Sequence, residues 1–424
     1  MARRFLSCLL CFVLTVAALS TFAGCTSRAI AATDLMEGIH PSESTDSSDE
    51  TEAPEGDLSE EQADALADFA VTLFQNSRSD DATLISPLSV SYALGMTANG
   101  ARDETLSQME QVLGMPIDQL NESLHAYAEE LPHDGDCKMS VANSLWVRQG
   151  LNVDQGFLKT NATWYDAGVF EAPFDETTVA DINQWTSQNT DGMIGSILDQ
   201  IPADAVMYLT NAIAFDATWQ HPYESDQIIK GTFTTQDGTE QTVDFMQSDE
   251  DLYLESANAI GFVKPYSNPS YAFAALLPNE GTGVDDLIES LDGASLRTML
   301  EEAHYATVDA KLPKFEIESQ TNMAETLAAM GMTDAFDRET ADFTGMSTEE
   351  NLFISRILHK AYINVDEKGT KAAAVTSTEM TGTSAMVEPE EVKTVHLDRP
   401  FVYLLIDRET NLPLFMGVIE TMEG

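Results

Sequence analysis

The spacing of apolar residues predicts three helices early in the chain. Apolar side chains recur at helical intervals from Leu66 to Phe74, and Ser59 to Gln62 precede them with capping-box spacing. Ser86-Pro87 opens a second helix that is apolar nearly all round, so we expect it to be buried. A third helix is predicted from Arg102 to Leu113, with Gly114 as its end.

Strand patterns dominate the later part of the chain. Three helical segments interrupt them, near Val179–Asp199, Asp286–Ala303 and Thr321–Gly331. Helices early and strands late, without βαβ alternation, predict an α+β fold with largely antiparallel sheets in one large domain that starts at Leu58. The predicted strands are Val141–Val147, Met207–Thr218, Gly261–Leu277, Thr307–Leu312, Ala361–Val365, Phe401–Ile406 and Pro413–Ile419.

One long segment, Asp366 to Lys393, is patterned both as a loop and as a strand. It has no aromatic residue, and a loop this long inside a domain is uncommon and usually functional or disordered. Every second residue from Thr370 to Met380 is uncharged, whereas the alternate set carries Lys371 and Glu379. This period of two predicts a segment that is exposed as a loop and could also enter a sheet.

The N-terminal part of the chain is typical of an exported lipoprotein. Residues 1–24 have two arginines, an apolar run and small residues, as in a secretory signal peptide. Phe22-Ala23-Gly24-Cys25 resembles a bacterial lipobox, which would make Cys25 the lipidated first residue; the alternative is plain secretion with cleavage elsewhere. Residues 25–57 are acidic and of low complexity, and we expect a disordered tether. Beyond Cys25 the chain has one further cysteine, Cys137, so we expect no intramolecular disulfide.

Charge and motif searches exclude several function classes. The net charge of −50 disfavours nucleic acid and anionic membrane surfaces, and it favours either cationic partners or solubility alone. The sequence has no GxSxG, HExxH, CxxC, P-loop or GxGxxG motif, and its seven histidines lack metal-ligand spacing. We therefore expect no metal and no cofactor.

Motifs spread over the whole domain resemble those of the serpin family. Each motif is weak alone, and their order and combined coverage from about Leu58 to Glu420 are specific. They are Ile85-Ser86-Pro87-Leu88-Ser89, Asn183-Gln184-Trp185, Thr190-Asp191-Gly192-Met193-Ile194, Leu209 to Phe215 with Trp219, Leu312-Pro313-Lys314-Phe315, His359-Lys360-Ala361, Arg399-Pro400-Phe401 and Leu414-Phe415-Met416-Gly417.

The resemblance implies a serpin-like fold for residues 58–424, with mostly antiparallel sheets, about eight or nine helices and an exposed reactive-centre loop at about 366–393. It implies a suicide inhibitor of serine proteases: the protease cuts the loop, and the cut loop inserts as a new strand into a large sheet. The residues that resemble the loop hinge are Glu367, Gly369, Thr370, Ala372, Ala373, Ala374, Val375 and Thr376. Those that resemble a buried polar cluster beneath the sheet are Ser86, Ser89, Asn211 and His359, whereas Trp219 is interpreted as core packing.

The family's loop count also implies the bond that is cut. It places the residue before the cut sixteen positions after the hinge glutamate, and 367 plus 16 gives Thr383, followed by Ser384. Threonine suits elastase-like or subtilisin-like proteases with small apolar primary pockets. A slip in register would make Met380 or Met386 the cut residue, and Glu379 or Glu388 would indicate a glutamate-specific protease.

Three functions remain open on the sequence. The first is an inhibitory serpin, monomeric, anchored at the cell surface by its lipid or secreted, with no nucleic-acid partner. The second is a non-inhibitory serpin that acts as a binding or carrier module or as a protease substrate. The third, an enzyme on an unrelated α+β fold, is disfavoured because no nucleophile–base motif is present.

Overall fold

The helices of the structure follow the predicted order, and further helices lie between the predicted ones. The structure is a computed structural model that describes residues 30–40, 58–78, 83–132, 135–202, 205–348, 352–370 and 392–422. The helices among these residues are α1 (Glu60–Asn76), α2 (Pro87–Ala98), α3 (Asp103–Leu113), α4 (Ile117–Glu130), α5 (Gln155–Trp164), α6 (Glu176–Asn189), α7 (Val284–Glu289), α8 (Gly293–Glu301) and α9 (Met323–Ala329), with 3₁₀ turns at Ser225–Gln227 and Asp334–Phe336.

The predicted signals at the helix ends are present. Ser59 and Gln62 form a reciprocal capping box at the start of α1. Every residue of α2 is buried, as its all-round apolar pattern predicts. Gly114 ends α3 with a left-handed φ of 79°, a conformation that glycine adopts without steric cost.

One predicted helix is two helices in the structure. The segment Asp286–Ala303 is divided into α7 and α8, because Asp292 begins a new helix: its carboxylate accepts a hydrogen bond from the Ser295 amide at 2.7 Å. Helices α4 and α5 were not predicted. The buried residues Leu120, Leu124 and Tyr127 of α4 do recur at helical spacing, so this signal was present in the sequence.

The strands form two sheets in the described part of the chain. The first has seven strands in the order β1-β4-β3-β5-β13-β12-β11 and contains parallel pairs at β3–β4 and β5–β12. Its strands are β1 (Thr33–Asp34), β4 (Gly168–Ala172), β3 (Cys137–Arg148), β5 (Met207–Thr218), β13 (Gly369–Thr370), β12 (Arg356–Val365) and β11 (Phe315–Asn322).

The second sheet has nine strands and is antiparallel except at β10–β14. Its order is β14-β10-β7-β8-β9-β15-β16-β2, and β6 pairs with β7 off this path. The strands are β14 (Lys393–His396), β10 (His304–Pro313), β7 (Glu240–Glu255), β8 (Ala259–Pro265), β9 (Tyr271–Pro278), β15 (Phe401–Asp407), β16 (Pro413–Ile419), β2 (Thr83–Ile85) and β6 (Ile228–Thr234).

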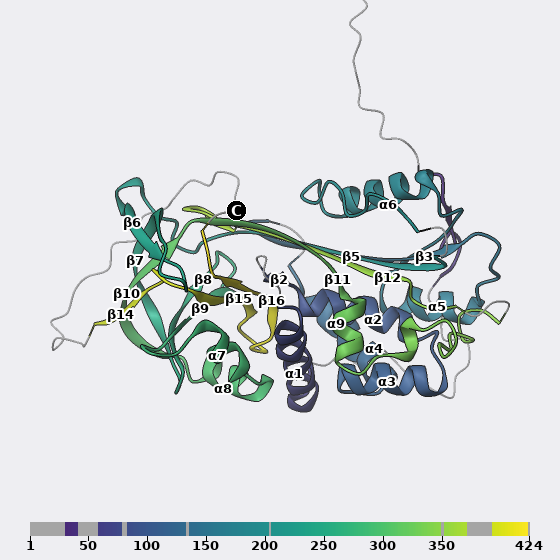
Figure 1. Ribbon diagram of the computed structural model, residues 1–424, viewed down its shortest axis with the longest axis horizontal. Helices are drawn as coiled ribbons and strands as arrows, with labels where there is room; N and C mark the ends of the chain where they lie inside the picture. The colour runs from purple at the N-terminus through teal and green to yellow at the C-terminus, as the bar shows by residue number, and fades with distance from the viewer. Residues whose placement is uncertain are drawn as a thin grey trace, which may run out of the picture. The chain divides into compact units, whose positions relative to one another are not determined.

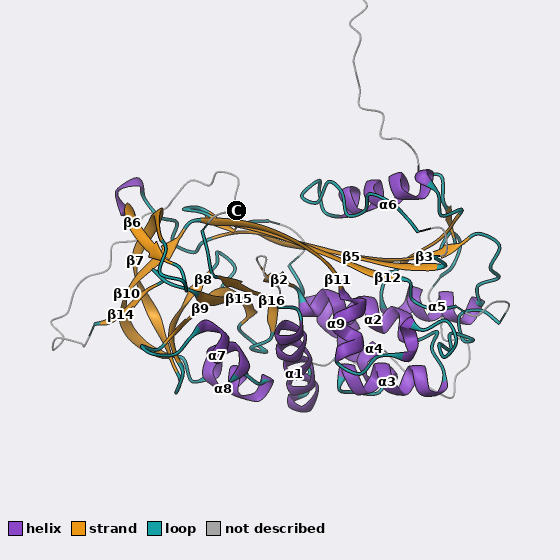
Figure 2. Ribbon diagram, in the orientation of Figure 1, coloured by secondary structure: helices purple, strands orange, loops and turns teal. Residues whose placement is uncertain are grey.

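The helices cover the seven-stranded sheet on both faces. Figure 1 shows α6 on one face, and α2, α4 and α9 on the opposite face. Figure 2 shows that β3, β5, β11 and β12 run as long neighbouring strands between these helical layers. One contiguous apolar core joins both sheets and α1. The α+β fold with mostly antiparallel sheets is therefore confirmed.

The expected tether is wrong for residues 30–40, because this part of it has a defined structure. Thr33 and Asp34 form β1 against the edge strand β4. The amides of Ala31 and Ala32 donate to the carboxylate of Asp181 in α6, at 3.0 and 2.9 Å. A few apolar residues (Leu35, Met36 and Ile39) pack against the core, a signal that the polar average of the whole segment concealed.

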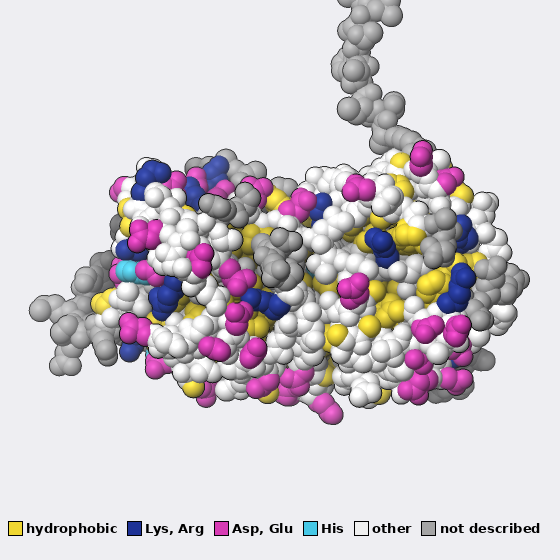
Figure 3. Space-filling view, viewed as in Figure 1, with side chains coloured by type: hydrophobic (Ala, Val, Ile, Leu, Met, Phe, Trp, Pro, Cys, Tyr) yellow, Lys and Arg dark blue, Asp and Glu magenta, His cyan; other side chains and the backbone are white. Residues whose placement is uncertain are grey.

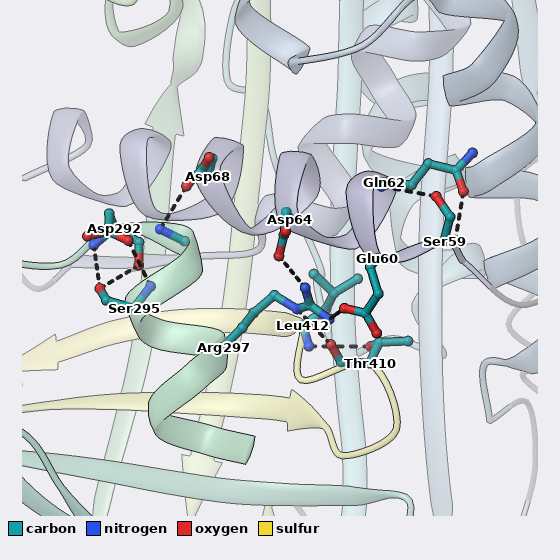
Figure 4. Close-up of polar contacts among 11 residues, drawn as sticks. Ser59, Glu60, Gln62, Asp64, Asp68, Asp292, Ser295, Arg297, Thr410 and Leu412 are labelled. Carbon is teal, nitrogen blue, oxygen red and sulfur yellow. Dashed lines mark hydrogen bonds and ion pairs between the residues drawn. The ribbon is translucent and has the colours of Figure 1, made fainter. Parts of the chain in front are cut away.

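Polar contacts join α1 to α8, as Figure 4 shows. The guanidinium of Arg297 in α8 pairs with Glu60 at 3.0 Å and with Asp64, both on α1. Its Nε donates to the carbonyl of Thr410 in the β15–β16 turn at 3.1 Å. Gly293 lies so close to α1 that a Cβ would come within 2.3 Å of the Asp68 amide nitrogen. This close approach explains a glycine at the start of α8.

Charge is spread over the surface. On the face in Figure 3, acidic side chains are scattered over both ends of the molecule, and basic side chains occur as separate small groups. This face therefore has no continuous basic stripe of the kind that polyanions require.

Candidate functional site

Only part of the predicted site lies among the described residues. Glu367, Gly369 and Thr370 are described, as are the four residues of the predicted polar cluster. The remaining hinge residues and the predicted cut bond lie outside the described residues, and so does the predicted lipidation site: Ala372, Ala373, Ala374, Val375, Thr376, Thr383, Ser384 and Cys25.

The stem of the long loop is a tight turn between β12 and β13. The Asp366 amide donates to the Gly369 carbonyl at 3.0 Å, and the Asp366 carboxylate accepts from the Lys368 amide at 2.8 Å. Val365 lies opposite Thr370 across this turn. The chain therefore reverses direction immediately before the predicted insertion segment.

Strand β13 already lies within the seven-stranded sheet, between β12 and β5. Gly369 and Thr370 pair antiparallel with Thr218 and Ala217 of β5. A Cβ on Gly369 would stand 2.0 Å from the Ala217 carbonyl oxygen, so the position requires glycine. The Thr370 side chain is fully buried, and its hydroxyl is 2.7 Å from the Tyr266 hydroxyl.

The segment that follows β5 holds the stem through backbone carbonyls. Trp219 donates its indole N–H to the Asp366 carbonyl and its amide N–H to the Lys368 carbonyl, both at 2.9 Å. The Tyr223 amide donates to the Glu367 carbonyl at 2.8 Å. Three consecutive carbonyls of the stem are thus satisfied by two aromatic residues, and these bonds must break if the stem is to move.

An ion pair adds a further restraint on the stem. The Lys314 ammonium lies 2.5 Å from a carboxylate oxygen of Glu367. The hydrogen bond from Lys314 holds the pKa of the Glu367 carboxyl below its usual value. Both side chains are about one third exposed, so water and salt screen this pair.

The four predicted polar-cluster residues lie together beneath the sheet. Asn211 of β5 donates its side-chain amide to Ser89, and its side-chain oxygen contacts Nδ1 of His359 on the neighbouring strand β12. The Ser86 hydroxyl donates to the Leu414 carbonyl at 2.7 Å, and the Ser86 amide donates to His359 Nε2 at 3.1 Å. All four side chains are at most 1% exposed.

The hydrogen bonds assign the tautomer of His359. Because Nε2 accepts from the Ser86 amide, the proton belongs on Nδ1, where it is donated to the side-chain oxygen of Asn211. Burial lowers the pKa of His359 to about 3. The imidazole is therefore neutral at physiological pH and acts as a hydrogen-bonded bridge between α2 and the sheet.

The polar cluster lies at the centre of the paired stretch of β5 and β12, three residues before the end at which the two strands separate. Arg356–Tyr362 pair in parallel with Tyr208–Ala214, and beyond this stretch β13 lies between the two strands. Asn211 and His359 face each other in this register. A longer β13 would have to part the two strands at this position.

A family model described as Serpin (serine protease inhibitor) matches residues 64–421, most of the chain. The chain belongs to the serpin family. Its relatives include Iripin-8 of Ixodes ricinus, which is 30% identical over 372 residues, covering 84% of this chain and 92% of the relative. The leukocyte elastase inhibitor of Equus caballus is 30% identical over 382 residues, covering 84% of this chain and 98% of the relative.

Solved structures show the same fold. The thermophilic serpin tengpin in its native state is 43% identical, with a TM-score of 0.85 and coverage of 92% of this chain and 99% of tengpin. Tengpin in its latent state gives a TM-score of 0.77, with coverage of 87% and 100%. The predicted serpin fold is thus confirmed, and this serpin is more similar to the native state of tengpin than to the latent one.

Sequence reasoning missed two residues of the serpin site. Asn143 of β3 accepts from the Asn211 side chain and extends the polar cluster across the sheet. Tyr266 stacks on Trp219 with ring centroids 4.7 Å apart and contacts Thr370. Neither residue has a motif of its own: the register of β3 with β5 brings Asn143 to the site, and an isolated antiparallel bridge with Trp219 brings Tyr266 there. Trp219 packs in the core as expected, at 1% exposure.

Among the described residues of this serpin, no group of three or more His, Cys, Asp or Glu side chains could hold a metal ion. No helix among the described residues is both long enough and apolar enough to cross a bilayer. Cys137 is free and buried at the start of β3, and burial raises the pKa of its thiol to about 12.

Proposed function

We propose that this serpin inhibits serine proteases as a suicide substrate, through insertion of the cut loop between β5 and β12. The observation that carries the proposal is the position of Thr370: it is uncharged, fully buried and already paired with β5. Extension of β13 from this start would add main-chain hydrogen bonds to both neighbouring strands. About a dozen new bonds at 0.5–1.5 kcal/mol each would contribute on the order of 10 kcal/mol.

That energy is comparable to the whole stability of a domain, so it suffices to distort a protease tethered to the loop. The restraints on the stem support the same proposal. The bonds from Trp219 and Tyr223, with the Lys314–Glu367 pair, hold the uncut loop at its first two strand residues.

We propose that the target proteases have small apolar primary pockets and cut at Thr383–Ser384. The test uses a panel of an elastase, a subtilisin-type protease and trypsin. We expect an SDS-resistant 1:1 complex with the first two and a released peptide that begins at Ser384. A peptide that begins after Met380 or Met386 would overturn the assignment of the bond. The variant Thr383→Arg is the matched control, and it should transfer inhibition to trypsin.

The same gels separate inhibition from the alternative of a non-inhibitory binding or carrier serpin. Such a protein would be cut in the loop without forming a complex.

We further propose that the domain is exported and anchored through a lipid on Cys25. Substitution of Cys25 by Ser should move the protein from the membrane fraction to the soluble fraction, and retention in the membrane fraction would contradict the anchor.

A further inference from the structure

The N-terminal segment of residues 31–39, called here the docked segment, is bound to one edge of the seven-stranded sheet. Its strand β1 pairs antiparallel with the edge strand β4. The Leu35 amide donates to the Val169 carbonyl at 2.9 Å and continues this pairing beyond β1. The docked segment is therefore part of the sheet.

Asp181 of α6 holds the start of the docked segment. Its carboxylate accepts hydrogen bonds from the amides of Ala31 and Ala32 at 3.0 and 2.9 Å, and the residue is 1% exposed. A buried carboxylate is costly without such partners. Ile39, at the other end of the segment, packs against the core. The segment is thus held at both ends, and the position of Ala31 on the domain is fixed.

The connection from Ala31 back to the proposed lipidation site is short. Cys25 precedes Ala31 by six positions in the sequence. A fully extended chain advances at most about 3.6 Å for each residue, so the two Cα atoms are at most about 20 Å apart. If the segment were not docked, the connection would run 33 positions to Leu58 and could extend to more than about 100 Å. Docking therefore limits how far the domain can move from a lipid on Cys25.

The docked segment and the stem of the reactive loop lie toward opposite ends of β5. Phe170, which pairs with β1, lies opposite Trp146 of β3, and Trp146 lies opposite Tyr208 of β5. Thr370 of the stem lies opposite Ala217 of β5. Tyr208 and Ala217 are nine positions apart, which corresponds to about 30 Å along the strand.

Charge gives the docked segment no means of adsorbing to an anionic bilayer. Asp34 and Glu37 are exposed carboxylates, and residues 31–39 contain no Lys or Arg. The net charge of −50 also repels anionic headgroups. The length and the position of the connection, and not adsorption, would therefore determine which side of the domain faces the bilayer.

We propose that the sheet edge formed by β1 and β4, together with α6, is the surface of this serpin that faces a lipid bilayer, and that the docked segment fixes this orientation. The inference rests on the proposed lipid anchor at Cys25 and does not depend on the proposed inhibition. It adds a condition on the partners. The reactive loop points away from the membrane, toward proteases that are free in the surroundings, and a protease embedded in the same bilayer meets the opposite end of the serpin.

The test measures energy transfer from one fluorescent donor on the full-length exported protein to acceptors in the headgroups of the vesicles that hold it. The donor is attached through Gln149→Cys or through Lys368→Cys. Gln149 is exposed, and its amide donates to the carbonyl of Ala172 at the end of β4, whereas Lys368 is exposed in the loop stem. Because Cys137 is buried, the protein without either substitution gives the background of labelling. We expect at least about twofold more transfer from position 149 than from position 368, since the two ends of the sheet are about 30 Å apart.

Two variants test whether the docked segment causes this difference. Insertion of about 20 Gly and Ser residues after Arg28 lengthens the connection and leaves the docked contacts unchanged, so the ratio of the two transfers should fall toward one. Leu35→Ser with Ile39→Ser removes apolar contacts of the docked segment and should lower the ratio in the same way. The matched control Glu37→Gln, an exposed change in the same segment, should keep the ratio.

Equal transfer from the two positions in the membrane-bound protein would overturn the orientation. A ratio that persists with the longer connection would also overturn it, because adsorption of the surface would then be the cause. Failure of the anchor has a separate signature, since the protein would be absent from the membrane fraction, and this result would overturn the anchor and the orientation together. Failure of the proposed inhibition would appear only in the protease assays and would leave the two transfers unchanged.

Discussion

The pairings of β15 in one sheet and the β5–β12 pairing in the other are built for opposite behaviour. In the nine-stranded sheet, β15 pairs antiparallel with β9 and β16, and every residue of these three strands is buried. In the seven-stranded sheet, β5 and β12 pair in parallel, and the side chains facing each other at the centre of the pairing are Asn211 and His359. The β15 pairings are closed by apolar packing, whereas the β5–β12 pairing adds to its apolar packing a buried polar cluster that continues into α2.

This difference in packing indicates which neighbouring strands can separate. Separation of β9, β15 and β16 would expose continuous apolar surface, at a cost of about 25 cal/mol for each Å². Separation of β5 from β12 breaks hydrogen bonds that an incoming strand could replace on both sides. A buried polar network is stable when it is complete and costly when it is incomplete. The β5–β12 pair therefore combines apolar packing with a central polar cluster that makes its closed state specific.

The largest expected effect comes from the hinge variant Thr370→Arg. An unpaired charge does not fit at this buried position beside Tyr266, so we expect the arginine to leave the sheet, and its burial again on insertion would cost roughly 3–5 kcal/mol. We expect the serpin to become a substrate, with more than a hundredfold loss of SDS-resistant complex. Lys368→Gln, an exposed change two residues earlier, should keep full inhibition. Normal complex formation by Thr370→Arg would show that β13 does not extend by this route.

The next effect tests the closed strand pair. Leu404 is fully buried in β15, so Leu404→Ala should lower the free energy of unfolding by about 2–5 kcal/mol. Chemical denaturation measures this loss. The partition of the loop between complex formation and simple cleavage should remain unchanged, because β15 does not separate from its neighbours during insertion. A change in that partition would remove the distinction between the two strand pairs.

The polar strand pair should give a distinct pH dependence. The pKa of His359 is about 3 in the folded protein, against 6.5 in an exposed histidine, so the unfolded chain binds the proton more readily between these values. Stability from this group is complete above about pH 6.5 and is lost as the pH falls toward 3, by at most about 1.4 kcal/mol per pH unit. His359→Gln should lack this component. Parallel stability–pH curves for the two proteins between pH 6.5 and 4 would contradict the assignment.

The smallest effect concerns the stem. Lys314→Gln removes the partner of Glu367, and since both side chains are partly exposed we expect a stability loss below about 1 kcal/mol. The rate of spontaneous loop insertion should rise, measured as loss of inhibitory activity during incubation at elevated temperature. High salt should reduce the difference from the wild-type protein. A difference that is independent of salt would mean that Lys314 acts through packing.

Much of the fold could be predicted because local and global signals agree. Ser59 with Gln62, Pro87 and Gly114 mark helix ends through contacts within a few residues, and β5 was predicted with its observed bounds. The missed helix α4 and the division of α7 from α8 had local signals, whereas the failure at residues 30–40 occurs where distant contacts determine the conformation. Residues 30–40 owe their conformation to the β4 edge and to Asp181, neither of which is visible in a local pattern.

The site residues also fall into two groups, those that a local motif predicts and those that a distant contact places. The hinge and the four cluster residues could be named because they lie in segments that resemble serpin motifs. Asn143 and Tyr266 could not, because their roles depend on the register of β3 with β5 and on stacking with Trp219.

The reactivity of the buried Cys137 thiol should distinguish loop insertion from unfolding of this serpin. Cys137 lies opposite Ala217, which in turn faces Thr370 on its other side. The proposed insertion would enlarge the sheet on the β12 side of β5 and leave the β3–β5 pairing intact, so we expect the thiol to stay protected from alkylating reagents. Unfolding separates β3 from β5 and exposes the thiol. Alkylation kinetics would therefore report global opening alone, even in a sample in which the loop is inserting.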